Sequence, residues 1–226
     1  LGIENNTVII YVGDNGTSSQ ISSVFEGDVF TGGKSQTTFF GTHVPLLVWG
    51  PGKVSAGAVN NDIVDFTDFL PTLAGISNIT VPPSFGTVDG VSFAPQLTGQ
   101  TGTPRDWSYD YFDPHPGQTK TKRWVQTKTY KLYDSATSGA FYNLINDPLE
   151  QYPIPNAVLT YAEDSIKQLL KNVLYGYLAS ESGVPVLVNP VVSDISDTSA
   201  ILGATITSDN ASQIRSRGVV YDTHSG

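Results

Sequence analysis

Apolar residues in the first quarter of the chain fall in two short runs, and each run ends in a polar, glycine-containing turn. The run at residues 7–12 is nearly continuous and rich in β-branched side chains, and it stops at Asp14, Asn15 and a glycine. The run at residues 44–49 follows a glycine-rich loop. Continuous apolar runs of this length are typical of parallel strands covered on both faces, so we expect two inner strands of an α/β sheet.

The period of the apolar pattern changes in the last third of the chain. Apolar residues at residues 161–180 recur every three or four positions, which predicts an amphipathic helix that closes the first domain. After residue 183 short apolar runs alternate with clusters of Ser, Asp, Asn and Thr, a pattern typical of a β-sandwich. These runs are residues 184–188, 200–206 and 218–221. We therefore expect one domain at residues 1–182 and an incomplete second one at residues 183–226.

The turn after the first run carries possible chemistry. Asp14 and Asn15 stand at the carboxyl end of an expected strand, where ligands bind in open α/β sheets. Their carboxylate and amide oxygens are the ligand types that Ca²⁺ or Mg²⁺ prefers. Asp-Asn-Gly is also ordinary turn chemistry, because Asn and Gly tolerate positive φ and Asp caps its own backbone. The turn alone leaves both interpretations open.

Several motifs follow this turn in a fixed order. A loop carries Lys34 between glycines and leads through His43 into a Val-Pro strand and a Pro-Gly turn. Further along come a Pro-Thr-Leu core at residues 64–76, an Asp-Gly-Val-Ser segment at 89–99, a Tyr-rich run at 123–133 and a run at 141–150 that ends in Asn-Asp-Pro-Leu-Glu. In this order, over residues 1–180, the chain resembles the sulfatase family of the alkaline phosphatase superfamily.

The resemblance implies a fold and a reaction. The fold would be α/β, with part of an alkaline-phosphatase-like sheet sandwiched by helices and a C-terminal antiparallel subdomain. The reaction would be hydrolysis of sulfate esters on a sulfated polysaccharide, oligosaccharide or other sulfate ester. Asp14 and Asn15 would hold Ca²⁺, the family's usual ion, or Mg²⁺. Lys34 would contact the sulfate or its bridging oxygen and help the leaving group depart.

Two histidines are weaker candidates. His43 departs from the commonest form of the family motif, in which another residue, often Arg, precedes Val-Pro. It is expected either to line the pocket, with a catalytic or substrate-binding role, or to hold a loop as a structural histidine. His115 stands among aromatic residues and prolines, as sugar-contacting residues often do, but turn structure explains this setting equally well.

Other charged residues have plausible structural roles. Asp65 and Asp68 fit the N-terminal region of a helix, where acidic side chains favour the helix dipole. Arg105 and Arg123 could bind an acidic sugar, or they could pair with carboxylates such as those of Asp106 or Asp110 on the surface.

The family's nucleophile does not occur in this sequence. Sulfatases carry it as a Cys or Ser followed by x-Pro-x-Arg, and this residue is oxidised to a formylglycine whose hydrate attacks sulfur. The string at residues 102–105 lacks both the nucleophile and the spacing. The family's paired Asp residues, further metal ligands at the end of its first strand, are not found either. We expect the chain to be the C-terminal portion of a longer enzyme, with the formylglycine elsewhere, and to be inactive alone.

Composition narrows the partners and the setting. The net charge is -9, with 12 Lys and Arg residues in total, which argues against a nucleic-acid binder. No apolar run reaches the roughly 18 residues that a membrane span needs. Few charges and many Gly, Pro and Ser residues favour a secreted, periplasmic or cell-surface bacterial protein. The end of the chain resembles the fibronectin type III-like modules of secreted Bacteroidetes-type enzymes. The sequence does not indicate an oligomeric state.

Two other functions stay open at this point. A phosphodiesterase or phosphonate hydrolase of the same superfamily would share the metal-binding sheet edge, although such relatives often use a second metal with extra His and Asp ligands. A non-enzymatic secreted surface protein with a vestigial sulfatase-like part is the third alternative. The missing N-terminal half separates them, because Cys or Ser with x-Pro-x-Arg indicates a sulfatase, Thr or an unmodified Ser a phosphoesterase, and neither motif a surface protein.

Overall fold

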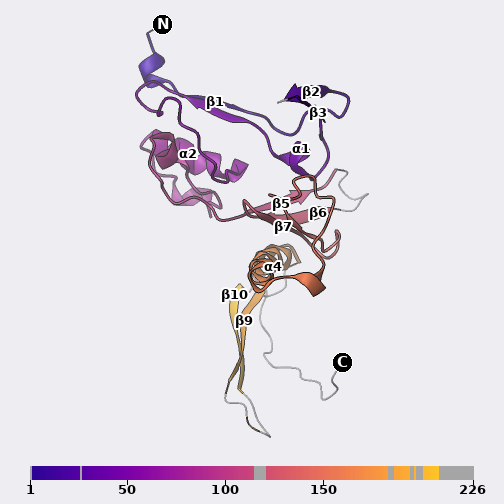
Figure 1. The fold of residues 1–226 in the computed structure, drawn as a ribbon. Coiled ribbons are helices and arrows are strands. Elements are labelled where there is room, and N and C mark those ends of the chain that lie inside the picture. Colours follow the sequence, from indigo (N-terminus) through magenta and orange to yellow (C-terminus); the bar gives the residue numbers. More distant parts are fainter. Residues whose placement is uncertain are drawn as a thin grey trace. The chain divides into compact units, whose positions relative to one another are not determined.

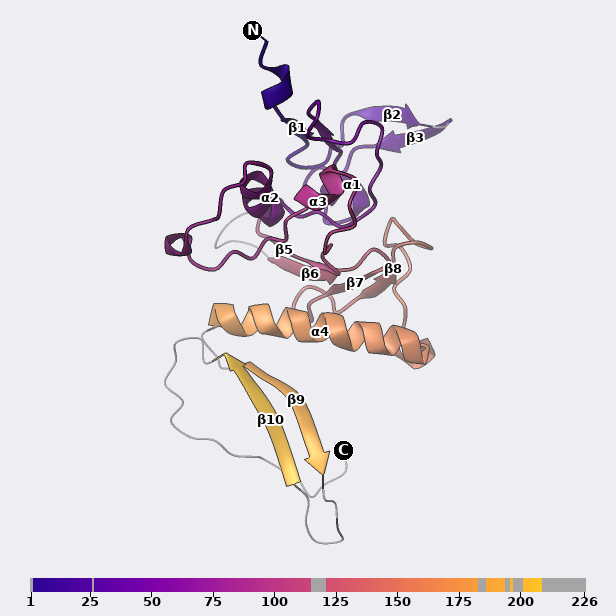
Figure 2. The same cartoon turned by 90° about the vertical axis from the view of Figure 1, so that its left-hand side faces the viewer.

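The computed structural model describes residues 2–25, 27–114, 121–182, 186–193, 196 and 201–208. They form two compact units, Leu1–Thr160 and Tyr161–Gly226. Helices and strands of the first unit are η1 (Glu4–Asn6), β1 (Ile9–Val12), β2 (Ser22–Phe25), β3 (Asp28–Thr31), α1 (Phe39–Thr42), β4 (Leu46–Trp49), η2 (Phe66–Asp68), α2 (Phe69–Ile76), η3 (Pro83–Phe85), α3 (Ala94–Leu97), β5 (Ser108–Phe112), β6 (Lys122–Gln126), β7 (Tyr130–Tyr133), β8 (Phe141–Asn143) and η4 (Asn156–Val158) (Figures 1 and 2). Within these described ranges, no helix is both long and apolar enough to cross a bilayer.

The two N-terminal apolar runs pair with each other as β1 and β4, but antiparallel, with Ile9 opposite Trp49 and Val12 opposite Leu46. A parallel pair needs a crossover of a dozen or more residues, usually a helix. The described residues between these strands form instead the β2–β3 hairpin and the single helical turn α1. The prediction of parallel inner strands is therefore wrong for this pair, because the connection reverses the chain.

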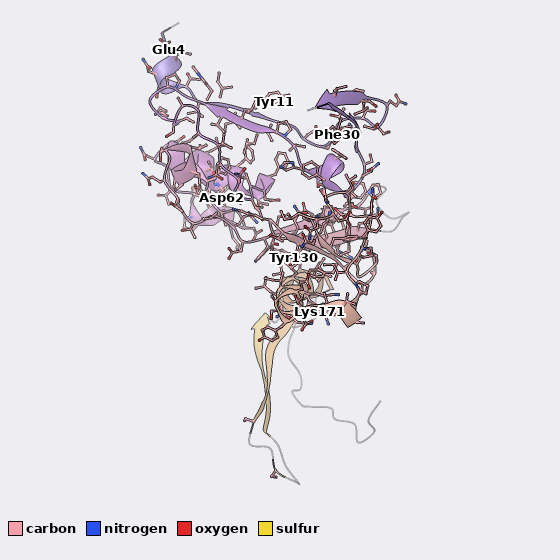
Figure 3. The ribbon with its side chains drawn as sticks, in the orientation of Figure 1. Glu4, Tyr11, Phe30, Asp62, Tyr130 and Lys171 are labelled. Atoms are coloured by element: carbon pink, nitrogen blue, oxygen red, sulfur yellow. The ribbon has the colours of Figure 1, made fainter. Side chains whose placement is uncertain are left out.

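One face of the β1–β4 pair is exposed, so the predicted cover on both faces is not seen within the described chain. Ile9 and Tyr11 on β1 are 54% and 60% exposed, and Leu47 and Trp49 on β4 are 63% and 49% exposed. Tyr11 is labelled in Figure 3. Ile9 lies opposite Trp49 and Tyr11 opposite Leu47, so the four side chains share one face. This face is apolar without being covered by the described residues.

The predicted C-terminal antiparallel subdomain is confirmed as the four-stranded sheet β5-β6-β7-β8. It holds most of the described core of the first unit, because adjacent residues on both faces are buried. The buried apolar side chains of this sheet are Trp124, Val125, Leu132, Tyr133 and Phe141. The predicted runs at residues 123–133 and 141–150 thus belong to a packed sheet. Its strands are three to five residues long, and each pairs with the next one along the chain.

Asp65 and Asp68 have structural roles at the start of a helical segment, as predicted. They form a capping box around η2, in which Asp65 accepts from the Thr67 amide at 2.9 Å and Asp68 accepts from the Asp65 amide at 2.8 Å. Asp68 is buried, and it also forms a two-pronged ion pair with Arg105. Such a fork fixes both side chains, so Arg105 belongs to the scaffold rather than to a sugar site.

Arg123 pairs with Asp134 at 3.6 Å, and its guanidinium lies 4.9 Å from the centre of the Tyr111 ring. Of the two alternatives for Arg105 and Arg123, the structure shows carboxylate pairing. The partners differ from the surface residues that the sequence suggested, since Asp68 and Asp134 are both buried.

A buried lysine organises one face of the four-stranded sheet. Lys131 on β7 is 1% exposed, and its Nζ donates to Glu150 Oε1 at 2.8 Å and to the carbonyl oxygen of Thr37. The Tyr133 hydroxyl donates to Glu150 Oε2 at 2.6 Å, and its oxygen lies 2.9 Å from Thr37 Oγ1. The Lys131 ammonium also lies 4.7 Å from the centre of the Trp124 ring. Two strands, β6 and β7, and the two loops that carry Thr37 and Glu150 therefore meet at one neutralised charge.

The titration of this cluster follows from its burial. Burial lowers the pKa of Lys131, and the carboxylate of Glu150 opposes that shift. Burial and the hydrogen bond with Glu150 raise the pKa of Tyr133, so it stays a neutral phenol that can donate. Burial also raises the pKa of Asp110 to about 6, with a further rise from Asp65 and an opposing effect of Lys131.

The second unit contains α4 (Tyr161–Ser182), β9 (Val186–Ser193) and β10 (Ile201–Ser208). The predicted helix at residues 161–180 is confirmed. β9 and β10 pair antiparallel and overlap the first two predicted runs of the module. The third run, residues 218–221, lies outside the described residues. One hairpin does not define a sandwich, so the fibronectin type III-like module stays a prediction. The role of the helix in closing the first domain and the domain boundary at residue 182 also stay predictions.

The buried ion pair gives a test of the packing in the longer protein that the sequence predicts. Lys131→Met should lower the free energy of unfolding by about 3 to 5 kcal/mol, because it leaves the Glu150 carboxylate buried without its cation. The variant Lys131→Met/Glu150→Gln should recover part of this loss. Lys128→Met, in an exposed pair on the same hairpin, is the control and should change little. The measurement is chemical denaturation. If Lys128→Met and Lys131→Met lowered the free energy of unfolding equally, the buried ion pair would have no special role in the packing.

Asp110 gives a pH-dependent test of the same face. Its folded-state pKa of about 6 lies above the ordinary value of 3.8, so ionisation of Asp110 costs stability. This cost is absent below pH 4, grows between pH 4 and 6 and is complete above pH 6. Asp110→Asn should therefore stabilise the protein by on the order of 1 to 3 kcal/mol at pH 7.5 and hardly at all at pH 4.

The measurement is chemical denaturation at both pH values, with the exposed Asp106→Asn as the matched variant. A stability difference between Asp110→Asn and wild type that is the same at pH 4 and pH 7.5 would exclude this role of burial.

Candidate functional site

Backbone contacts hold the acidic turn after β1 against the Lys34 loop. The amide of Gly16 donates to the carbonyl oxygen of Gly41 at 3.0 Å, and the amide of Lys34 donates to the carbonyl oxygen of Thr17 at 2.9 Å. A β-carbon at Gly16 would overlap the carbonyl oxygen of Phe40, so this approach requires glycine. The structure thereby brings together two segments that lie some twenty residues apart in the sequence.

The side chains of Asp14 and Asn15 are free of intramolecular partners within the described part of the chain. Asp14 is exposed and Asn15 is half-buried. Neither side chain caps a backbone amide there, and the turn is held by main-chain hydrogen bonds instead. The carboxylate and amide oxygens of this turn are consequently available to an external ligand.

Other acidic turns of this chain behave differently. Asp65, Asp134 and Asp147 each accept hydrogen bonds from backbone amides two to five residues further on, at 2.5 to 2.9 Å. Where an Asp of this chain shapes a turn, its side-chain oxygens therefore accept hydrogen bonds from backbone amides of that turn. Because Asp14 and Asn15 make no such bond among the described residues, turn chemistry alone does not explain them.

The donor set of this turn fits one side of a hard-cation site. Asp14 and Asn15 offer adjacent oxygens, whereas Ca²⁺ takes six to eight oxygen ligands and Mg²⁺ an octahedron of oxygens. Across the described ranges, no group of three or more His, Cys, Asp or Glu residues is placed to hold a metal ion. The described residues therefore fit a metal as partial ligands and do not complete its coordination.

Lys34 lies at the tip of a tight turn. Ser35 has a φ of 71°, and the amide of Gln36 donates to the carbonyl oxygen of Gly33 at 2.9 Å. The Lys34 side chain is exposed and has no hydrogen bond or ion pair with the rest of the described chain. This placement suits an anion-binding lysine and equally a solvated one, so the role of Lys34 stays a prediction.

His43 and Asn15 line the same pocket, which has a volume of about 200 Å³. The His43 ring also packs against that of Phe39, with 4.5 Å between ring centres and a tilt of 37°, and the His43 amide closes the α1 turn. His43 thus has a structural contact and a pocket position at once. Asp14 and Lys34 are not among the residues that line this pocket, and His115 lies outside the described residues.

The β2–β3 hairpin, for which the sequence predicts no role, forms another wall of the pocket. Ile21, Ser23, Phe30 and Thr31 come from this hairpin or its base. Its signal was present in the sequence, because two four-residue runs with β-branched and aromatic residues flank a Glu-Gly pair. Without the fold, nothing connects those runs to a pocket.

Comparisons with known proteins place the chain in a family. The family model described as N-sulphoglucosamine sulphohydrolase, C-terminal, matches residues 40–177. The human N-acetylgalactosamine-6-sulfatase is 27% identical over 191 residues, with 72% of this chain and 36% of that protein covered. A sulfatase from Formosa agariphila is 29% identical over 163 residues, with 69% and 28% covered.

Among solved structures, that of BT4656 in complex with its substrate D-glucosamine-2-N,6-O-disulfate has a TM-score of 0.60 at 22% identity, with 77% of this chain and 35% of that chain covered. This chain spans about a third of the length of these relatives. The family match begins after Asp14, Asn15 and Lys34 and includes His43. Because it covers more than half of the sequence, the chain belongs to the family of the C-terminal region of N-sulphoglucosamine sulphohydrolase, and thus to the sulfatases.

Proposed function

We propose that this chain is the C-terminal part of an enzyme that hydrolyses sulfate esters of a sulfated polysaccharide or oligosaccharide. The observation that carries the proposal is the Asp14-Asn15 turn, whose oxygens have no partner in the described chain and which main-chain hydrogen bonds hold against the Lys34 loop. Membership of a sulfatase family supports it, and so do relatives that are named for a sulfated sugar or whose structure holds one.

The chemistry of a sulfate ester suits these residues. Negative charge gathers on the sulfate oxygens and the leaving oxygen during cleavage, and fixed positive charge stabilises it. A divalent cation, Ca²⁺ or Mg²⁺, would supply such charge as a Lewis acid when bound. Asp14 and Asn15 would hold this cation. Lys34 would bind the sulfate or its bridging oxygen and could protonate the leaving group.

Residues and regions beyond this turn would complete the enzyme. The formylglycine nucleophile and further metal ligands would come from a segment outside this chain. His43 would contact substrate from the pocket wall, and His115 would belong to a sugar-contacting loop. We further propose a secreted, periplasmic or cell-surface bacterial enzyme, with residues 183–226 as a fibronectin type III-like spacer or adhesive module.

The first test uses the metal ligands in the full-length protein. Asp14→Ala should lower activity and remove most of the calcium-dependent stabilisation, which for wild type is about 2.7 kcal/mol at a calcium concentration 100 times Kd. The measurement is the thermal midpoint with calcium and with a chelator. Asp28→Ala, at an exposed position on β3, is the control and should keep the calcium response. An undiminished calcium response in Asp14→Ala would exclude Asp14 as a ligand.

The second test concerns Lys34 and the reaction itself. The full-length protein, expressed with a formylglycine-generating enzyme, should release sulfate from 4-nitrocatechol sulfate. Lys34→Ala should lower kcat about 100- to 1,000-fold with an unchanged thermal midpoint, because it removes charge stabilisation that acts mainly in the transition state. Lys128→Ala, at an exposed site far along the chain, should have wild-type turnover.

Normal turnover in Lys34→Ala would refute the role given to that residue. Cleavage of phosphodiesters or phosphonates without any release of sulfate, from protein shown by mass spectrometry to carry formylglycine, would refute the sulfatase proposal and favour a phosphoesterase.

A further inference from the structure

We infer that the β2–β3 hairpin forms the wall of a subsite for the sugar ring that carries the sulfate ester, and that this ring bears no carboxylate. The inference rests on the proposed function and deepens it, because it assigns the pocket next to Asn15 to the saccharide. It makes Ser23 and Phe30 residues that determine substrate specificity.

The register of the hairpin puts four of its five pocket-lining residues on one face, and Thr31, which lies opposite Ser22, on the other. Ser23 lies opposite Phe30, and side chains alternate between faces along each strand. Ile21 and Gly32 fall on the same face as this pair, and all four residues line the pocket. The next pair along the hairpin, Val24 and Val29, lies on the other face and is 71% and 70% exposed.

Aromatic rings link this wall to the opposite one. The Phe30 ring lies 5.5 Å from that of Phe40 on α1, centre to centre, with a tilt of 53°. Figures 1 and 2 show the hairpin beside α1, and Figure 3 labels Phe30 on β3. His43 and Asn15 complete the lining toward the acidic turn. A ligand in this pocket would therefore touch both an aromatic wall and Asn15, one of the two proposed metal ligands.

Apart from His43, the side chains that line the pocket are apolar or carry uncharged polar groups. The lining combines aromatic and aliphatic side chains, the hydroxyls of Ser23, Thr17 and Thr31 and the amide of Asn15, with no Asp, Glu, Lys or Arg. Aromatic rings pack against the apolar C–H face of a sugar, while hydroxyl groups bond its rim. A uronic acid would place its carboxylate here without a fixed cation as partner, which is costly.

Two hydroxyls in this wall have different freedom. Thr31 Oγ1 lies 3.1 Å from the hydroxyl of Ser22 across the hairpin and is thereby oriented. The Ser23 hydroxyl has no hydrogen-bond partner in the described part of the chain. It is the group available to a sugar hydroxyl.

Main-chain hydrogen bonds fix the wall to the candidate site. The amide of Gly32 donates to the carbonyl oxygen of Ile21 at 3.0 Å and closes the base of the hairpin. Two residues further, the Lys34 amide bonds to Thr17, beside the acidic turn. The hairpin is thus anchored at the same turn that carries Asp14 and Asn15, and a sugar on its inner face would be held in register with them.

The experiment compares variants on the two faces of the hairpin in the full-length, formylglycine-carrying enzyme. The probes are N-acetylgalactosamine 6-sulfate and D-glucosamine-2-N,6-O-disulfate as substrates, and inorganic sulfate as an inhibitor without a sugar. Phe30→Ala and Ser23→Ala should raise KM for a saccharide substrate about tenfold, with kcat and the inhibition constant of sulfate near their wild-type values. Val24→Ala and Val29→Ala, on the outer face, should match wild type.

Phe30→Leu keeps the bulk and separates loss of the aromatic face from loss of packing, and the thermal midpoint checks that each variant folds. A wild-type KM in both Phe30→Ala and Ser23→Ala, or an equal effect of Val29→Ala, would overturn the subsite. So would faster cleavage, relative to the two hexosamine substrates, of a sulfated uronic acid. Absence of all sulfate release in the wild type would instead refute the proposed function, so the two failures are distinguishable.

Discussion

The charge of Lys131 is buried in an antiparallel sheet, and the position of the Lys34 loop depends on how that charge is neutralised. Glu150 supplies the opposite charge at 2.8 Å, Trp124 supplies a ring face, and the carbonyl oxygen of Thr37 accepts a third interaction. A buried ammonium is tolerated only when its donors are satisfied, so these partners cannot separate independently. Thr37 stands three residues after Lys34, so the sheet holds the loop on which the proposed anion-binding lysine lies.

On the other side of that loop, glycine residues allow a close approach of the loop to the acidic turn after β1. The acidic turn and the loop approach through backbone atoms, and a side chain at Gly16 or Gly41 would overlap a carbonyl oxygen. Charge therefore fixes the loop to the four-stranded sheet, whereas the absence of side chains lets it approach β1. The polar side chains of the acidic turn need not take part in holding the turn, which is why Asp14 and Asn15 have no partner in the described chain and can serve a ligand.

The sequence predicted helix α4 from its local periodicity and the structural roles of Asp65 and Asp68 from their position before a helical run, whereas the C-terminal antiparallel sheet was implied by the family resemblance. It did not predict the direction in which β1 and β4 pair, since that depends on whether the connection crosses over or turns back. Nor could alternation along β7 show that Lys131 is buried, because its carboxylate partner comes from a turn nineteen residues later. The β2–β3 wall was missed for a related reason, since a short hairpin has no meaning for a site until the fold places it beside α1.

The exposed β1–β4 face and the two proposed metal ligands lie next to each other, because the turn that carries Asp14 and Asn15 directly follows β1. The four exposed side chains of that face are all large and apolar, and water contact with them is unfavourable by roughly 25 cal/mol for each Å². The acidic turn directly follows β1, so a further strand that paired along the whole of β1 would also reach Asp14 and Asn15. Oxygen ligands carried at the end of such a strand would complete the coordination that Asp14 and Asn15 would begin if they hold the proposed cation. Packing of the sheet and assembly of the metal site would then be the same event, and the metal would stabilise the fold as well as the reaction.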